Sequence, residues 1–167
     1  MSTNDPFDDM AEKMIAYAEV AIKNAALDLV LKLETRANGR LGSPVLTGRF
    51  EASHQIGINE VIETTAAPVV PYPKRGEHVE QTIFPPDPHV HIEQMKQFKL
   101  GDVIFVSNTV EYAEQLEDGG SRQAPGGVYG PTFAIWRAEF EAKLTQAYEA
   151  AASGEIVFGT STLTAPF

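Results

Sequence analysis

Two histidines and a glutamate in the middle of the chain have a spacing that could hold a metal ion. His89, His91 and Glu93 alternate with other residues, so on an extended chain their side chains point to the same side. A transition metal bound there could serve a small metal-dependent hydrolase. However, no third imidazole follows at a fixed spacing, and the surrounding segment is rich in proline. A solvated polar strand is the simpler interpretation, and we expect no metal and no cofactor.

Other residue types that could catalyse a reaction lack the setting that catalysis needs. Thr47–Gly48 and Ser121 lie beside glycines, but neither is embedded in the strand–turn–helix elbow of a nucleophilic serine. A group of carboxylates has helical spacing that puts several of them on one outward face, which is usually solvated. The carboxylates are Glu111, Glu114, Glu117 and Asp118. We therefore predict that the protein is not an enzyme.

The composition predicts a single acidic domain. The chain has 167 residues, a formal net charge of −10 and no cysteine. Disulfides, thiolate metal sites and cysteine nucleophiles are therefore excluded. Without a cluster of lysines or arginines the chain is not expected to grip nucleic acid, although DNA could pass an acidic surface without adhering to it. No apolar run approaches the roughly 20 residues that span a bilayer, and the acidic first residues do not resemble a signal peptide.

Two long amphipathic helices are predicted, one towards each end of the chain. Apolar residues recur at helical spacing from about Pro6 to Thr35, and Asn38–Gly39 is a strong stop. A second helix opens at Gly130–Pro131 and closes at Gly154. Its aromatic stripe makes it the expected main core element. The stripe consists of Phe133, Trp136, Phe140, Leu144, Tyr148 and Ala151.

Between the helices the patterns predict a small sheet. A loose alternation from Phe50 to Ile62 suggests a half-buried strand with Ile56, Ile58 and Ile62 on one side. Val103–Asn108 is denser in β-branched and aromatic residues and is the strongest strand signal. Val110–Asp118 suggests a short helix. The predicted fold is α+β, with two long helices packed on a small, mostly antiparallel sheet.

Two segments of the single predicted domain, residues 1–167, match no regular element. From Glu63 to Leu100 repeated prolines break any helix or central strand. This proline-rich arm or insertion either lies on a partner or is a solvent-exposed excursion with two short strands. The C-terminal tail, residues 155–167, is predicted to be extended and has no charged side chain after Glu155. It would either add a strand to a neighbour's sheet edge or cover its own.

Two short motifs resemble those of the tail-completion and head–tail joining proteins of long-tailed phages, relatives of the lambda minor tail protein Z. The first is Pro44-Val45-Leu46-Thr47-Gly48-Arg49-Phe50 with Ser53, similar to the family's P-V-x-T-G-x-L-x-x-S. The second is Asn108, Tyr112, Ala113, Leu116, Glu117 and Gly119, followed by Gln123-Ala124-Pro125-Gly126. It resembles the family's N-x-x-x-Y-A-x-x-x-E-x-G and P-x-G. The resemblance covers roughly the first sixty residues and those from Gly101 to about Gly154.

The resemblance implies a structural role without catalysis or a cofactor. It implies a homo-oligomeric ring, expected to be a hexamer, at the head-proximal end of the tail tube. The implied partners are the tail tube or tail terminator protein and a head-completion or connector protein, and DNA would pass through without specific binding. The protein would assemble in the host cytoplasm and reside at the neck of the virion. A tail terminator is the alternative within this setting. A metal-dependent hydrolase and an adaptor that binds a peptide at a sheet edge are the alternatives outside it.

The motif residues have structural roles that can be predicted. Gly48 and Gly119 allow backbone conformations that other residues resist. Tyr112 can bury its ring while its hydroxyl finds a partner, with Ala113 on the same inner face. Glu117 is expected to accept hydrogen bonds from the turn at 119–121. Arg49 could pair with an acidic residue or a carbonyl, and the simpler interpretation is a surface ion pair of little energetic value.

Overall fold

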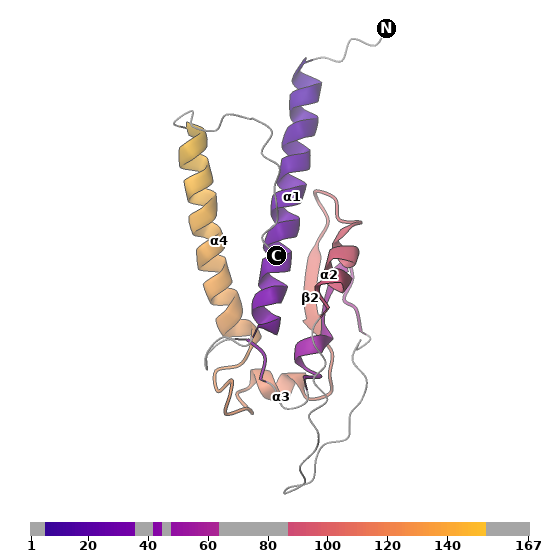
Figure 1. The fold of residues 1–167 in the computed structure, drawn as a ribbon, viewed down its shortest axis with the longest axis vertical. Helices are drawn as coiled ribbons and strands as arrows, with labels where there is room; N and C mark the ends of the chain where they lie inside the picture. Colours follow the sequence, from indigo (N-terminus) through magenta and orange to yellow (C-terminus); the bar gives the residue numbers. More distant parts are fainter. Residues whose placement is uncertain (1–5, 36–41, 45–47, 64–86, 153–167) are drawn as a thin grey trace, which may run out of the picture. The chain divides into compact units, whose positions relative to one another are not determined.

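The computed structural model describes residues 6–35, 42–44, 48–63 and 87–152. Within them the chain forms an α+β fold, as predicted, with helices and a two-stranded antiparallel sheet (Figure 1). The chain divides into two compact units, Met1–Trp136 and Arg137–Phe167, and the architecture below belongs to the first. The elements in order are α1 (Pro6–Glu34), a 3-10 turn η1 (Glu51–Ser53), β1 (His54–Ile58), α2 (Pro88–Met95), β2 (Ile104–Asn108), α3 (Ala113–Glu117) and α4 (Tyr129–Ala152).

The first long helix, α1, confirms the prediction to within one residue, but its two halves have different surroundings. Near its C-terminal end, Ala26, Val30 and Leu33 recur at helical spacing and are buried. In its first half, Phe7, Met14 and Tyr17 are 76%, 59% and 57% exposed. With about 3.6 residues per turn, these three lie on a different face of the helix from the buried residues. The apolar pattern of α1 therefore comprises two stripes.

The sheet pairs β1 with β2 in antiparallel register, with Ile56 opposite Val106. The predicted strand at 103–108 is confirmed, whereas the strand predicted from Phe50 to Ile62 is reduced to five residues. The expected alternation is also wrong, because His54–Gly57 are all buried. The chain folds back over the sheet at this point: a Cβ on Gly57 would collide with the carbonyl oxygen of Glu60 and touch the Ile62 side chain. The sheet face at Gly57, which the alternation predicted to be solvated, is therefore covered by the following residues of the chain.

Helix α2 corrects the prediction of an irregular arm from Glu63 to Leu100. Residues 64–86 lie outside the described part of the chain, but residues 88–95 are helical. Asp87 caps the helix by accepting a hydrogen bond from the His89 N–H at 3.0 Å, and Pro88 occupies the first helical turn. Proline is compatible with that position because its missing N–H would have no intrahelical partner there.

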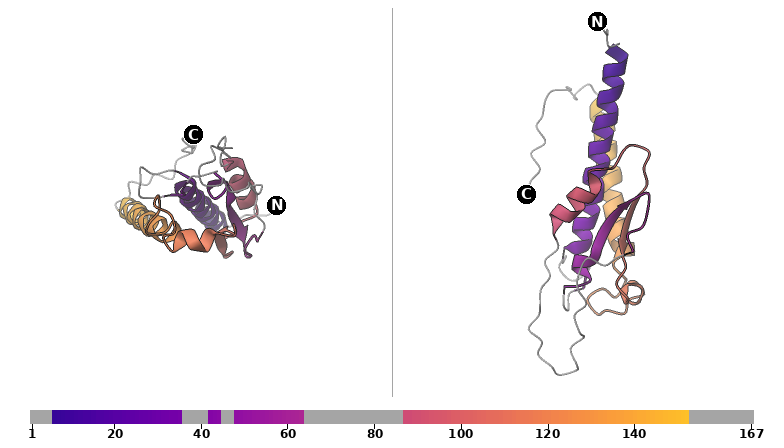
Figure 2. Two further views of the ribbon diagram at one scale, coloured as in Figure 1. Left: turned by 90° about the horizontal axis from the view of Figure 1, so that it is seen from below. Right: turned by 90° about the vertical axis from the view of Figure 1, so that its right-hand side faces the viewer.

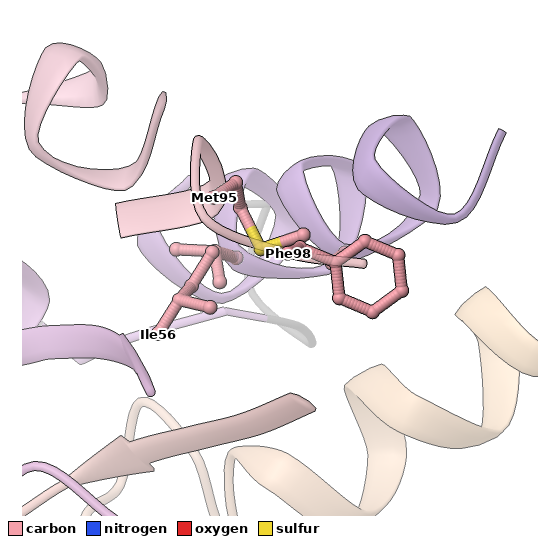
Figure 3. Close-up of a cluster of buried hydrophobic side chains, with 5 residues drawn as sticks. Ile56, Met95 and Phe98 are labelled. Atoms are coloured by element: carbon pink, nitrogen blue, oxygen red, sulfur yellow. The ribbon is translucent and has the colours of Figure 1, made fainter. Parts of the chain in front are cut away.

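The first core cluster joins α1, α2 and the sheet, which lie side by side in Figure 2. Met95 and the following Phe98 are 2% and 1% exposed and pack with Ile56 (Figure 3). The remaining buried members are Ala26 and Val30. A segment predicted to be an arm thus supplies two of the most buried side chains of the described structure.

A second core cluster lies where the end of α1 meets the segment from 110 to 128. Its buried members are Leu33, Phe50, Val110, Ala124 and Val128. The short helix α3 covers five residues of the predicted 110–118, and Tyr112, Ala113 and Leu116 pack against the cluster, as expected for its inner face.

Helix α4 exists where predicted but is not the main core element. Phe133 and Leu144 are 47% and 52% exposed, and among the described side chains of α4 only the half-buried Tyr129 packs against a core cluster. The core is already filled by α1, the sheet, α2 and residues 110–128. Trp136 is half-buried and donates its Nε1–H to the carbonyl oxygen of Ala25 at 2.9 Å. The side chains of Tyr148 and Ala151, and the tail 155–167, lie outside the described residues.

Candidate functional site

The structure brings together two of the motif segments, which are about sixty residues apart in sequence. Arg49 donates to both carboxylate oxygens of Glu111, at 2.7 and 3.2 Å. Asn108 donates its side-chain N–H to the Phe50 carbonyl oxygen at 2.7 Å and accepts from the Val110 N–H at 3.3 Å. The rings of Phe50 and Tyr112 lie 6.3 Å apart. Each motif is therefore part of the other's immediate packing, and we call this region the motif junction.

The ion pair in the motif junction is not a surface pair of the kind predicted. The Arg49 side chain is only 6% exposed, whereas that of Glu111 is 67% exposed. The guanidinium also lies 5.8 Å from the Tyr112 ring centroid. Its hydrogen bonds hold the pKa of Glu111 below its usual range. A buried cation thus depends on a carboxylate that still reaches solvent.

Glu117 binds a different turn from the one predicted. Its carboxylate accepts backbone N–H bonds from Val128, Tyr129 and Gly130 at 2.8, 2.8 and 2.9 Å. Burial alone would raise the pKa of Glu117, but these three donors outweigh it and the pKa lies below its usual range. The residue therefore caps the start of α4, where free N–H groups and the helix dipole favour a negative charge.

The glycines and prolines of the motifs have separate roles. Gly48 and Gly119 adopt φ angles of 81° and 82°, a left-handed region that favours glycine. A Cβ on Gly119 would also lie 2.6 Å from the Pro125 carbonyl oxygen. Pro125 and Gly126 are exposed on the loop before α4. Thr47 lies outside the described residues.

A chain of buried polar side chains next to the motif junction was not predicted. Ser43 donates its hydroxyl to the Leu33 carbonyl oxygen at 2.7 Å and contacts His54 Nε2 at 2.8 Å. On the other side of the ring, His54 Nδ1 lies 2.7 Å from the Tyr129 hydroxyl. Ser43 and His54 are each 2% exposed. These contacts tie the end of α1, the start of β1 and the start of α4 together.

The direction of each hydrogen bond in this chain follows from its ends. Because the single proton of Ser43 is given to Leu33, its oxygen must accept from His54, so Nε2 carries a proton. Burial, with a further contribution from the charge of His91, lowers the pKa of His54 to about 3. The ring is therefore neutral, and Nδ1 accepts from Tyr129, whose own pKa is raised by burial and by the nearby charges of Glu117 and Glu34. His54 cannot take the serine proton as a general base in this arrangement.

A second buried histidine has the opposite surroundings. His91 Nε2 lies 2.6 Å from a carboxylate oxygen of Glu34, and its Nδ1 lies 3.3 Å from Gln94 Oε1. The same Gln94 oxygen accepts the Ile56 N–H at 3.0 Å, which fixes the orientation of the amide. Burial alone would lower the pKa of His91, but the hydrogen bond and charge of Glu34, with smaller contributions from Gln94 and Asp87, raise it. Both ring nitrogens face acceptors, so His91 is an imidazolium ion.

The histidine pair is not arranged as the extended-chain interpretation required. His89, His91 and Glu93 lie on α2, where residues two apart point in nearly opposite directions. His89 is exposed, His91 faces Glu34, and Glu93 pairs with Lys96 at 2.6 Å. Within the ranges that the structure describes, no group of three histidine, cysteine or acidic side chains could hold a metal ion. The polar strand expected at this position is likewise a helix.

Carboxylates on and beside α3 line an open hollow on the surface. It is formed by Glu111, Glu114, Gln115, Asp118, Gly119 and Gly120. Glu114 and Asp118 are exposed, as the sequence predicted for a solvated face, whereas Glu117 turns inward.

Of the described helices, none is both long and apolar enough to cross a membrane.

The buried polar groups could not have been found from local patterns. Ser43, Glu34 and Tyr129 have their partners 11, 57 and 75 positions away in the chain.

Comparisons with protein-family models, with curated proteins and with solved structures find no match for this chain.

Proposed function

We propose that the protein is a structural component of the virion that forms a tail-completion or head–tail joining ring at the neck of a long-tailed phage. The observation that carries the proposal is the motif junction. The segments that resemble this phage family pack against each other through Arg49 and Glu111 and through Asn108 and Phe50. The resemblance is thus supported by a spatial relation that the sequence does not reveal.

The chemistry of the described residues favours a structural role over a catalytic one. The buried serine–histidine contact is used to bridge elements, because its protons run towards the Leu33 carbonyl. The His91 ring binds Glu34, so it is not available as a metal ligand together with His89 and Glu93. The motif residues that lie inward fix turns and helix starts, as Glu117 does for α4.

Two surface properties support a homo-oligomeric ring, for which six copies are expected. The first half of α1 presents Phe7, Met14 and Tyr17 to solvent, and exposed apolar surface of this kind is typical of an interaction site. The formal charge of −10 suits a ring through which DNA passes without binding. The expected partners are the tail tube or terminator protein on one side and a head-completion or connector protein on the other.

Deleting the gene in the phage that encodes the protein tests this function. We expect filled heads and tails of normal length that fail to join, with joining restored by the intact chain supplied in trans. Electron microscopy of the particles measures both properties, and a His89→Ala chain should restore joining as well as the unaltered one. Over-long tails would instead identify a tail terminator. Normal joined particles, or location of the protein away from the neck, would contradict the proposal.

A further inference from the structure

At the outer edge of β2, a row of backbone groups has no hydrogen-bond partner among the described residues. Asn59 donates its N–H to the Val103 carbonyl oxygen at 2.8 Å, which continues the β1–β2 register by one pair. Pairs alternate along an antiparallel ladder between hydrogen-bonded and non-bonded, so the Ile56–Val106 pair is non-bonded. The Ile56 N–H is consistent with this, because it points away from β2 to Gln94. On β2, the N–H and C=O groups of Ile104, Val106 and Asn108 consequently point away from β1.

The two edges of the sheet differ in how they are covered. On the β1 side, α2 closes the edge by accepting the Ile56 N–H. On the β2 side, no described residue pairs with the outward backbone groups of Ile104 and Val106. Natural edge strands are usually protected by lysine, proline or a bulge. The stretch from Val103 to Asn108 has no charge and no proline, and Val103 and Phe105 are 54% and 36% exposed.

We propose that the edge of β2 receives the C-terminal segment, residues 155–167, of a second copy of this chain as a third strand. The segment reads EIVFGTSTLTAPF and carries no charge after Glu155. Its β-branched and aromatic residues suit a strand. Ile156, Val157 and Phe158 are consecutive, so both faces of an added strand would be apolar at that point. One face would extend the core side of Ile104 and Val106, and the other would cover Phe105.

A second copy is the chosen partner because of how the chain is divided. The β2 edge belongs to the compact unit Met1–Trp136, whereas the segment belongs to the unit Arg137–Phe167. When the segment of one copy binds the β2 edge of the next, the pair still has one unoccupied β2 edge and one unbound segment. Further copies can therefore add, and a head-to-tail contact of this kind can close into a ring. The inference rests on the ring in the proposed function and names the contact that would build it.

The absence of cysteine from the chain allows a direct test by disulfide formation. One full-length chain carries Val103→Cys, at a residue that is 54% exposed beside Phe105 on the same side of the sheet, and a second, isotopically heavier full-length chain carries a single cysteine at one of positions 156–164. We expect mixed disulfide dimers whose yield alternates from one position to the next, because alternate residues of a strand share a face. Glu60→Cys, on an exposed turn, is the matched control in place of Val103→Cys and should give only background dimer.

A second pair of variants tests the edge without cysteines. Phe105→Lys places a charge beside the open edge, and we expect it to weaken self-association by about tenfold or more. Val61→Lys makes the same change of charge at an apolar residue that is 46% exposed and should leave self-association unchanged. Sedimentation measures the association, and amide exchange at Val106 should slow on assembly only in the chain that retains Phe105.

The inference is overturned if no position gives more mixed dimer than the Glu60→Cys control. It is also overturned if a chain that carries both cysteines cross-links only within itself, since the segment then covers its own edge. Loss of association with Val61→Lys as well as Phe105→Lys would contradict a role specific to this edge. Mixed dimers from a protein located away from the neck would leave this inference standing and contradict the proposed function alone.

Discussion

Two buried histidines in one compact unit are held in opposite charge states. His54 and His91 are 2% and 5% exposed, so solvent exposure does not distinguish them. His54 meets one acceptor and one donor, Ser43 and Tyr129, and is neutral. His91 meets two acceptors, Glu34 and Gln94, and is charged. The hydrogen-bond partners of a buried histidine therefore decide its protonation state. Neutral His54 links β1 to Ser43 and α4, and charged His91 links α2 to α1.

The largest effect is expected from removing the charged histidine. His91→Leu leaves the Glu34 carboxylate, which is 3% exposed, without its cation. Breaking a buried pair in this way should cost about 3–5 kcal/mol of unfolding free energy, measured by urea denaturation at neutral pH. His89→Leu, on the exposed side of the same helix, is the matched control and should change stability by less than about 0.5 kcal/mol.

The double variant Glu34→Met with His91→Leu separates charge from packing. Replacing both members of a buried ion pair by apolar residues is often neutral, so most of the lost stability should return. If the double variant is as unstable as the sum of the two single changes, the loss comes from packing and the interpretation of an ion pair is wrong.

The pH dependence of stability should distinguish the two histidines by sign. The pKa of His54 falls from 6.5 in the unfolded chain to about 3 in the fold, so the unfolded state binds more protons and stability decreases as pH falls below 6.5. The pKa of His91 is raised, so its contribution is complete below 6.5 and is lost as pH rises through the folded value. Between pH 6.5 and 4.5 we expect His54 to remove roughly 2–3 kcal/mol.

Three carboxylates whose pKa is lowered in the fold do not obscure this window. They are Asp102, Glu111 and Glu117, with reference values of 3.8, 4.5 and 4.5, so their contributions are lost only at lower pH. Urea midpoints measured across the range should lose the acid limb in His54→Asn and the alkaline limb in His91→Leu. In an NMR titration from pH 6.5 to 4.5, the His54 ring signals should stay constant, because the pKa of His54 is about 3. Movement of the His54 ring signals within this range would contradict the assigned neutral state.

The smallest effect is expected at the donor to His54. Tyr129→Phe leaves Nδ1 buried without a hydrogen bond and should cost about 1–2 kcal/mol. The proton should remain on Nε2, because Ser43 still accepts from it, and nitrogen chemical shifts of the ring report this. Tyr17→Phe, at a tyrosine that is 57% exposed, is the control for the loss of a hydroxyl. A shift of the proton to Nδ1 would show that Tyr129, and not Ser43, selects the tautomer.

Local signals predicted the elements that local physics determines. The extent of α1 follows from its apolar periodicity, and β2 follows from a run of β-branched and aromatic residues. Helix α2 was missed because Pro88 was taken as a breaker, although the first turn of a helix accepts proline. Its eight residues are also too few to display a clear period.

The candidate site was only partly predictable, for a different reason. The motif residues were found by resemblance, but their partners depend on the tertiary fold. Glu117 was assigned to the adjacent turn, whereas it binds N–H groups eleven to thirteen positions later. The aromatic stripe of α4 was taken for core because periodicity indicates an apolar face without identifying what covers it.

The hydrogen bonds from Tyr129 through His54 and Ser43 to Leu33 all donate in one direction. This arrangement bears on which strand register is stable. A slip of β1 by one residue would turn His54 to the opposite face of the sheet. The hydroxyls of Ser43 and Tyr129 would then lose the histidine partner that they share. Because three elements must be aligned at once for these hydrogen bonds to form, a slipped register would lose both bonds of His54 and be less stable than the native one.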